Sequence, residues 1–263
     1  MLNETELPLT EHLAELRWRI VIILCALALG TLLSWGFREE ILGALLSPAI
    51  SALGPEANLQ ALAPTEIFFT YLKSALLAGF VLSLPVIFWQ IWAFVAPGLY
   101  PNEKRAVIPF VSAATLLFAL GAFFGHQLVF PLVYGFFAEF SSDFVASAWT
   151  MHEVFGLTTR LFLAFGVGFE LPVVVFFLAV SGIATPGRLL SGVKYGVLVA
   201  FVLGALLTPP DIVSQVLLAA PLTVLYLLGV LAGYLVVRNR GEEPTSRDGE
   251  NDDVDGPAGS GES

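Results

Sequence analysis

The stretch IFFTYLKSALLAGFVLSLPVIFWQIWAFV, residues 67–95, contains one charged side chain, Lys73, and is otherwise strongly apolar. A helix needs roughly 20 apolar residues to cross a hydrocarbon core about 30 Å thick. This stretch is therefore long enough to span a membrane. Pro85 within it predicts a kinked helix whose neighbours satisfy the freed backbone carbonyl.

The overall composition agrees with a membrane protein. Of the 263 residues, 57% are hydrophobic and only 13% are charged, whereas soluble domains contain about a quarter charged residues. The formal net charge of −10 argues against a protein that binds nucleic acid. One cysteine and three histidines leave little for a disulfide framework or a metal site. We therefore expect no metal and no cofactor.

Six apolar stretches predict an all-α polytopic protein with six transmembrane helices. The fifth stretch would be only about 21 Å long as a helix, which is shorter than the hydrocarbon core, unless residues 190–193 extend it. Both alternatives stay open from the sequence. The predicted spans are residues 20–37, 67–95, 106–140, 154–183, 195–208 and 212–237.

The basic residues predict the orientation and the domain organisation. With a cytoplasmic N-terminus, every Lys and Arg except Arg38, Lys73 and Arg160 lies on the cytoplasmic side. An excess of Lys and Arg on the cytoplasmic side is usual in membrane proteins, and here it predicts that both termini lie in the cytoplasm. Residues 1–238 then form the membrane domain. Residues 239–263 form an acidic tail with too few apolar side chains to fold.

The segment between the first two spans, residues 38–64, is predicted to lie on the outer side. The spacing of Ile41, Leu45 and Leu46 predicts a short interfacial helix that ends near Pro48.

Glu170 lies midway along the fourth span, where an ionisable group costs at least a few kcal/mol. It should therefore face a cavity, water or a polar partner. One interpretation makes it a docking point for a polar group of another membrane protein or a substrate. The alternative pairs it internally with Gln215 or Gln90. Arg160 lies about 15 Å away along the helix axis and is too far to pair with it.

Two further polar residues stand at the start of the sixth span. Asp211 and Gln215 are four residues apart and share one helix face. Asp211 suits the positive end of the helix dipole, whereas Gln215 lies deeper and is expected to form a hydrogen bond with another helix.

Two acids on the predicted cytoplasmic side come from distant segments. Glu15 precedes the first span, and an ion pair with Arg19, four residues later, is enough to explain it. Glu103 lies just inside a helix start, where Asn102 caps the helix and an acid is favoured in any case. Together the two carboxylates could also bind two guanidinium groups through charge-assisted hydrogen bonds.

Five motifs, in this order, resemble the TatC family, the multi-spanning core of the twin-arginine protein translocase. The resemblance covers the chain from about residue 8 to residue 237. The motifs are His12-Leu-Ala-Glu-Leu-Arg, Ser47-Pro48, Phe94-Val-Ala-Pro-Gly-Leu-Tyr-Pro-Asn-Glu103, Phe165-Gly-Val-Gly-Phe-Glu170-Leu-Pro and Leu207-Thr-Pro-Pro-Asp211-Ile-Val-Ser-Gln215.

The resemblance implies a six-helix bundle, curved around a concave face, in the inner cell membrane. It implies that Glu15 and Glu103 bind the paired arginines of the signal peptides of folded cargo proteins, next to Leu16, Arg17, Phe94 and Tyr100. It also implies that Pro48, Glu170, Asp211 and Gln215 serve structure or contacts with single-span partners, TatA-like and TatB-like. His126 is a departure from the family pattern and receives no role.

The implied function is that of a receptor in a multimeric, self-associating complex surrounded by lipid, not that of an enzyme. The chain contains no nucleotide-binding loop of the form G-x-x-x-x-G-K-[ST]. The alternative is a secondary transporter that uses Glu170 and Arg160. It would require two half-chain repeats with matching broken helices, and the sequence has no convincing repeat.

Overall fold

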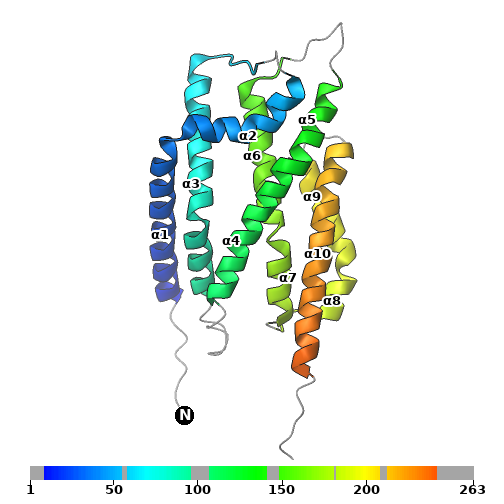
Figure 1. The fold of residues 1–263 in the computed structure, drawn as a ribbon. Helices are drawn as coiled ribbons and strands as arrows, with labels where there is room; N and C mark the ends of the chain where they lie inside the picture. Colours follow the sequence, from blue (N-terminus) through cyan, green and yellow to red (C-terminus); the bar gives the residue numbers. More distant parts are fainter. Residues whose placement is uncertain are drawn as a thin grey trace, which may run out of the picture.

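The computed structural model describes residues 9–54, 58–95, 107–140, 148–180, 182–207 and 212–241, and this part of the chain is built from helices (Figure 1). Five helical segments are long and apolar enough to cross a membrane, and a sixth, Val193–Leu206, is apolar but shorter. The predicted fold class, an all-α polytopic membrane protein, is confirmed.

The helices follow the predicted spans, with breaks inside two of them. In chain order they are α1 (Leu9–Trp35), α2 (Arg38–Leu53), α3 (Pro64–Val95), α4 (Val107–Phe124), the π-helix η3 (Gly125–Val129), α5 (Phe130–Ala138), α6 (Met151–Gly168), α7 (Leu171–Val180), α8 (Pro186–Ser191), α9 (Val193–Leu207) and α10 (Ile212–Gly241).

A proline follows each of the two breaks. The third span passes from α4 through η3 into α5, where Pro131 occupies the first turn. The fourth span is interrupted by a turn at Phe169 and Glu170, and Pro172 follows in the first turn of α7. A proline ring supplies no N–H and is tolerated best in the first turn of a helix. A proline at the start of the second helix is thus compatible with each break, whereas α3 and α10 continue through Pro85 and Pro221.

The fifth span, α9, has 15 residues and a length of about 22 Å. It starts at Val193, two residues before the predicted boundary. A turn at Gly192 separates it from α8, so residues 190–193 do not extend it into one longer helix.

The prediction for α2 was wrong about where the helix ends. The helix does not end near Pro48, but continues through it to Leu53, and Pro48 is buried. Its apolar face packs into the protein core, where Leu42, Leu45 and Leu46 are buried. Figure 1 shows α2 lying across the bundle at the end opposite the N-terminus. The sequence pattern was right, but the surface that it covers is protein.

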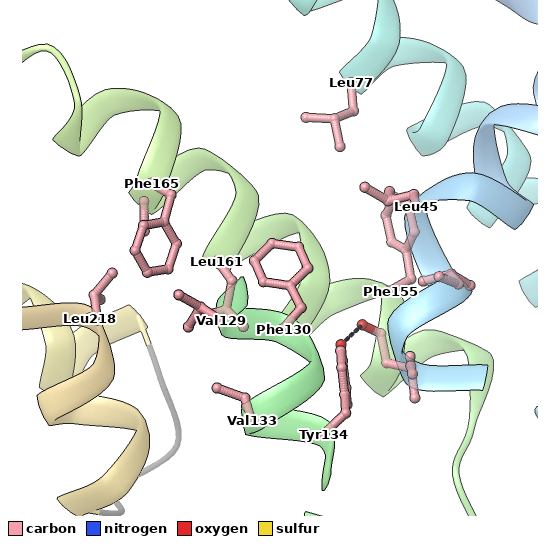
Figure 2. Close-up of a cluster of buried hydrophobic side chains, with 14 of the residues drawn as sticks. Leu45, Leu77, Val129, Phe130, Val133, Tyr134, Phe155, Leu161, Phe165 and Leu218 are labelled. Carbon is pink, nitrogen blue, oxygen red and sulfur yellow. Dashed lines mark hydrogen bonds between the residues drawn. The ribbon is translucent and has the colours of Figure 1, made fainter. Parts of the chain in front are cut away.

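The main core lies where α2, α5, α6 and α10 meet (Figure 2). Phe130, Leu161, Phe165 and Leu218 are fully buried there. The hydroxyl of Tyr134 lies 2.5 Å from Thr158 Oγ1 and donates to the carbonyl of Val154 at 3.1 Å. This network satisfies the buried hydroxyl groups of Tyr134 and Thr158.

α1 stands at the edge of the bundle. In its most apolar 18-residue segment only 6% of the residues are buried, against 28–39% in the corresponding segments of the other long spans. It packs mainly on α3. A Cβ added at Gly30 would lie 2.6 Å from the carbonyl oxygen of Gly79, and one added at Gly79 would lie 2.7 Å from Thr31 Cα. These two glycines therefore allow the two backbones to approach closely, as small residues do between membrane helices.

Candidate functional site

The start of α1, the end of α3 and the start of α4 lie at one end of the bundle, which we call the N-terminal end (Figure 1). Arg19 joins two of these helices. Its Nε donates to Glu15 Oε1 at 3.0 Å, and its Nη2 also contacts that oxygen. Its Nη1 donates to Gln90 Oε1 at 3.1 Å, and its Nη2 donates to the carbonyl oxygen of Ala93 at 3.0 Å.

The contact with Ala93 has a clear physical basis. The last four carbonyls of a helix have no partner within the helix, and α3 ends at Val95. A guanidinium group at this position satisfies one of these carbonyls and interacts favourably with the negative end of the helix dipole. Arg19 therefore fixes α1 to the last turn of α3.

Glu15 is held in place and remains accessible. The contacts of Arg19 engage Oε1, yet 34% of the Glu15 side chain is exposed, against 18% for Arg19. The ion pair between Glu15 and Arg19 that the sequence predicted is present. Since the carboxylate is partly exposed, the same group can also face a second cation from outside the protein.

The other residues predicted for this end are only partly described. Leu16 is half-buried, Arg17 is exposed, and Phe94 is half-buried in the last turn of α3. Glu103 and Tyr100 lie outside the described residues.

Sequence reasoning missed the hydrogen bonds that Arg19 makes to α3. It identified Arg19 only as a partner of Glu15 and considered Gln90 only as a partner of Glu170. The available signal was the position of Gln90, a polar residue near the end of an apolar span.

Glu170 lies in the turn between α6 and α7. Its Oε1 is buried and has no hydrogen-bond partner among the described residues. The predicted internal pairing is not found: among the described residues no hydrogen bond joins Glu170 to Gln90 or Gln215. Gln90 Oε1 accepts from Arg19, and Gln215 Nε2 donates to the carbonyl oxygen of Phe201 at 2.9 Å.

The bond from Gln215 joins α10 to α9, which confirms the predicted contact with another helix. Asp211 lies outside the described residues. Arg160 is exposed, and within the described ranges no ion pair joins it to Glu170.

The opposite end of the bundle is held by backbone contacts that the sequence did not reveal. Gln60 donates to the carbonyl of Trp149 at 3.0 Å and accepts from the N–H of Met151 at 2.8 Å. The carboxylate of Glu66 accepts from the N–H groups of Leu62 and His152, both at 2.8 Å. These bonds join the segment before α3 to the start of α6.

Comparison with known proteins identifies the family. The family model described as "Sec-independent protein translocase protein (TatC)" matches residues 11–221 of this chain. The chain is 39% identical to the TatC protein of Desulforapulum autotrophicum over 96% of this chain and 93% of that protein. It is 38% identical to TatC of Aquifex aeolicus over 90% of this chain and 98% of that protein.

The fold agrees with this assignment. A solved structure described as "Crystal Structure of Twin Arginine Translocase Receptor- TatC" superposes with a TM-score of 0.77 at 37% identity, covering 86% of this chain and all of that one. These findings support a component of a protein translocase, a multi-pass membrane protein that works with other Tat subunits, and not an enzyme. The chain belongs to the TatC family of Sec-independent protein translocase proteins.

Proposed function

We propose that this chain is the receptor of its translocase for twin-arginine signal peptides, and that it binds them at the N-terminal end of the bundle. One observation carries the proposal: Glu15 presents a partly exposed carboxylate that Arg19 holds against the end of α3. The solved TatC structure to which the chain is similar is itself described as a twin-arginine translocase receptor.

The chemistry of the site suits a pair of guanidinium groups. One arginine of the signal would bind Glu15, and the other would bind Glu103, which lies in the sequence between α3 and α4. A charge-assisted hydrogen bond contributes about 1.5–3 kcal/mol, so the loss of one such contact lowers affinity by roughly ten- to a hundredfold. Lysine is a poor substitute, because it lacks the planar fork that binds a carboxylate with two donors. Leu16, Arg17, Phe94 and Tyr100 would flank the bound peptide.

The proposal includes the setting in the cell. Both termini lie in the cytoplasm and the bundle lies in the inner cell membrane, so that the site faces newly folded cargo. Glu170, Gln215, Asp211 and Pro48 serve structure or contacts with TatA-like and TatB-like single-span subunits. The position of Glu170 supports this part, because an ionisable side chain that is only partly buried within a span is costly unless a polar group faces it.

The test is crosslinking of an Arg-Arg signal peptide to the full-length protein in membranes that contain its partner subunits. The variants are Glu15→Gln and Glu103→Gln, which remove charge while keeping size. Glu40→Gln is the matched control, since Glu40 is an exposed acid on α2, far from the N-terminal end.

We expect both site variants to lose at least nine-tenths of the crosslink, and the control and its expression level to remain normal. A Lys-Lys peptide should crosslink as poorly to the wild type as the Arg-Arg peptide does to the variants. An undiminished crosslink in Glu15→Gln would place recognition elsewhere and refute the proposed site.

A further inference from the structure

Pro48 leaves a backbone carbonyl of α2 without its helical partner. In an α-helix the carbonyl of residue i accepts from the N–H of residue i+4, so the carbonyl of Ala44 would accept from residue 48. Pro48 has no N–H to donate, yet α2 continues through it to Leu53. The carbonyl of Ala44 is therefore free to accept hydrogen bonds from other donors.

Two side chains supply these donors. Ser47 Oγ donates to the carbonyl oxygen of Ala44 at 2.8 Å, which is a local bond. The second donor is His126, whose Nε2 lies 2.9 Å from the same oxygen although it is 82 positions away in the chain. Since a carbonyl can only accept, Nε2 carries the proton in this contact.

The π-helix places His126 beside α2. η3 covers Gly125–Val129, and the N–H of Phe130 donates to the carbonyl of Gly125, five residues back. The widened turn comes just before Pro131, which cannot donate to the carbonyl four residues earlier. The His126 ring packs edge-on against Phe130, with 5.7 Å between the ring centroids. Pro131 thus explains the irregular turn that contains His126. Pro48 explains why the carbonyl of Ala44 is free to bind this histidine.

We propose that His126 is a positioning residue: its Nε2–H donates to the carbonyl that Pro48 frees and fixes the middle of α2 onto the third span. The start of α2 has a separate attachment, because Arg38 donates to the carbonyl of Trp35 at 3.3 Å and its guanidinium lies 5.8 Å from the Tyr71 ring centroid. In the middle of α2, where Pro48 interrupts the helical hydrogen bonds, the attachment is the bond from His126.

The position of α2 matters for the space beneath it. An apolar hollow of about 580 Å³ is lined by Ala44 and Leu45 from α2, by Phe37 and Leu77, and by His126 itself. If α2 lost its attachment to the third span, one wall of this hollow would move. His126 therefore also defines the shape of the hollow.

The first experiment reads the tautomer directly and needs no change at His126. The chain has three histidines, so the double variant His12→Gln/His152→Gln leaves His126 as the sole histidine. In protein labelled with ¹⁵N-histidine, reconstituted in bilayers, we expect an Nε2–H tautomer with a proton that exchanges slowly with water. The Nδ1–H tautomer would overturn the proposal, because Nε2 could not then donate to Ala44.

The second experiment tests the link between His126 and Pro48 through stability. His126→Phe should lower the apparent Tm of the purified full-length protein by about 2–4 °C, the effect of one lost hydrogen bond in a chain of this size. His126→Gln retains an N–H donor and should recover at least half of the loss. His152→Phe is the control for replacing an exposed histidine.

Pro48→Ala provides the decisive comparison. It restores an N–H at position 48 that can bond to the carbonyl of Ala44 within α2. In that background His126→Phe should cost less than half of its effect in the wild type. Equal losses in both backgrounds would show that His126 acts through packing alone, and would overturn the proposal.

Discussion

Substitution of Gly79 by alanine tests how α1 is held. A Cβ at this position would lie 2.6 Å from Thr31 Oγ1 and 2.7 Å from Thr31 Cα, whereas carbon atoms in contact normally lie about 3.5–4.0 Å apart. The obstacle at Cα is backbone, so no side-chain rotation can relieve it. α1 must therefore move away from α3 by about 1 Å, the difference between these distances.

The expected cost follows from two opposing terms. Overpacking of a close contact costs about 1–3 kcal/mol, and replacing a helical glycine by alanine returns about 0.5–1 kcal/mol. The net loss lies between about 0 and 2.5 kcal/mol, and its central value of about 1 kcal/mol corresponds to an apparent Tm that is lower by about 2–4 °C. The consequence is local, because α1 makes few contacts besides those with α3.

The assay is thermal unfolding of the purified protein, with Gly156→Ala as the matched control. A Cβ at Gly156 meets nothing within 4 Å, so this variant gains helix propensity without a clash and should have an unchanged or slightly higher Tm. Gly30→Ala introduces a clash at the same contact between α1 and α3, this time from α1. The double variant Gly30→Ala/Gly79→Ala should lose less than the sum of the single variants, because one displacement of α1 relieves both clashes. If Gly79→Ala were as stable as Gly156→Ala, close approach of the two backbones would not be what holds α1.

Three further variants test other parts of the structure. Arg19→Lys keeps the charge, but a lysine cannot bind Gln90, the carbonyl of Ala93 and the carboxylate of Glu15 together. Crosslinking of the signal peptide should therefore fall about tenfold. Undiminished crosslinking would show that these bonds of Arg19 are dispensable for signal binding. Tyr134→Phe removes the hydroxyl that lies 2.5 Å from Thr158 Oγ1, and unfolding should occur about 2–4 °C lower; no shift would mean that the buried hydroxyl contributes nothing. Glu66→Gln offers one acceptor in place of two to a pair of backbone N–H groups, so limited proteolysis before α3 should be faster while signal binding at the other end stays normal; equal proteolysis would contradict this role.

The spans could be predicted from sequence because length and apolarity decide them with little help from tertiary contacts. A stretch such as residues 67–95 has no other stable place than a membrane. The sequence did not predict which prolines accompany a break, because α3 and α10 continue through Pro85 and Pro221 whereas breaks precede Pro131 and Pro172. It also did not predict that α2 continues through Pro48, where the carbonyl of Ala44 accepts from Ser47 and from a histidine of another helix.

The candidate site was predictable only as a set of residues. The spacing of Glu15 and Arg19 predicts their ion pair, since both lie on one helix. The bonds from Arg19 to α3 depend on how the two helices cross, and a sequence does not state this. The same holds for Glu170: the sequence offers Gln90 and Gln215 as partners, but in the structure these amides bind Arg19 and the carbonyl of Phe201.

The attachment of α1 to α3 has a consequence for biogenesis. The close contact at Gly30 and Gly79 and the hydrogen bonds of Arg19 to described residues involve positions up to Ala93. The main core, in contrast, requires helices as late as α10. Chains fold from the N-terminus as they are synthesised. The helical hairpin that carries Glu15 can therefore assemble in the bilayer while most of the chain is still unmade, and the later helices are added to an end that is already in place.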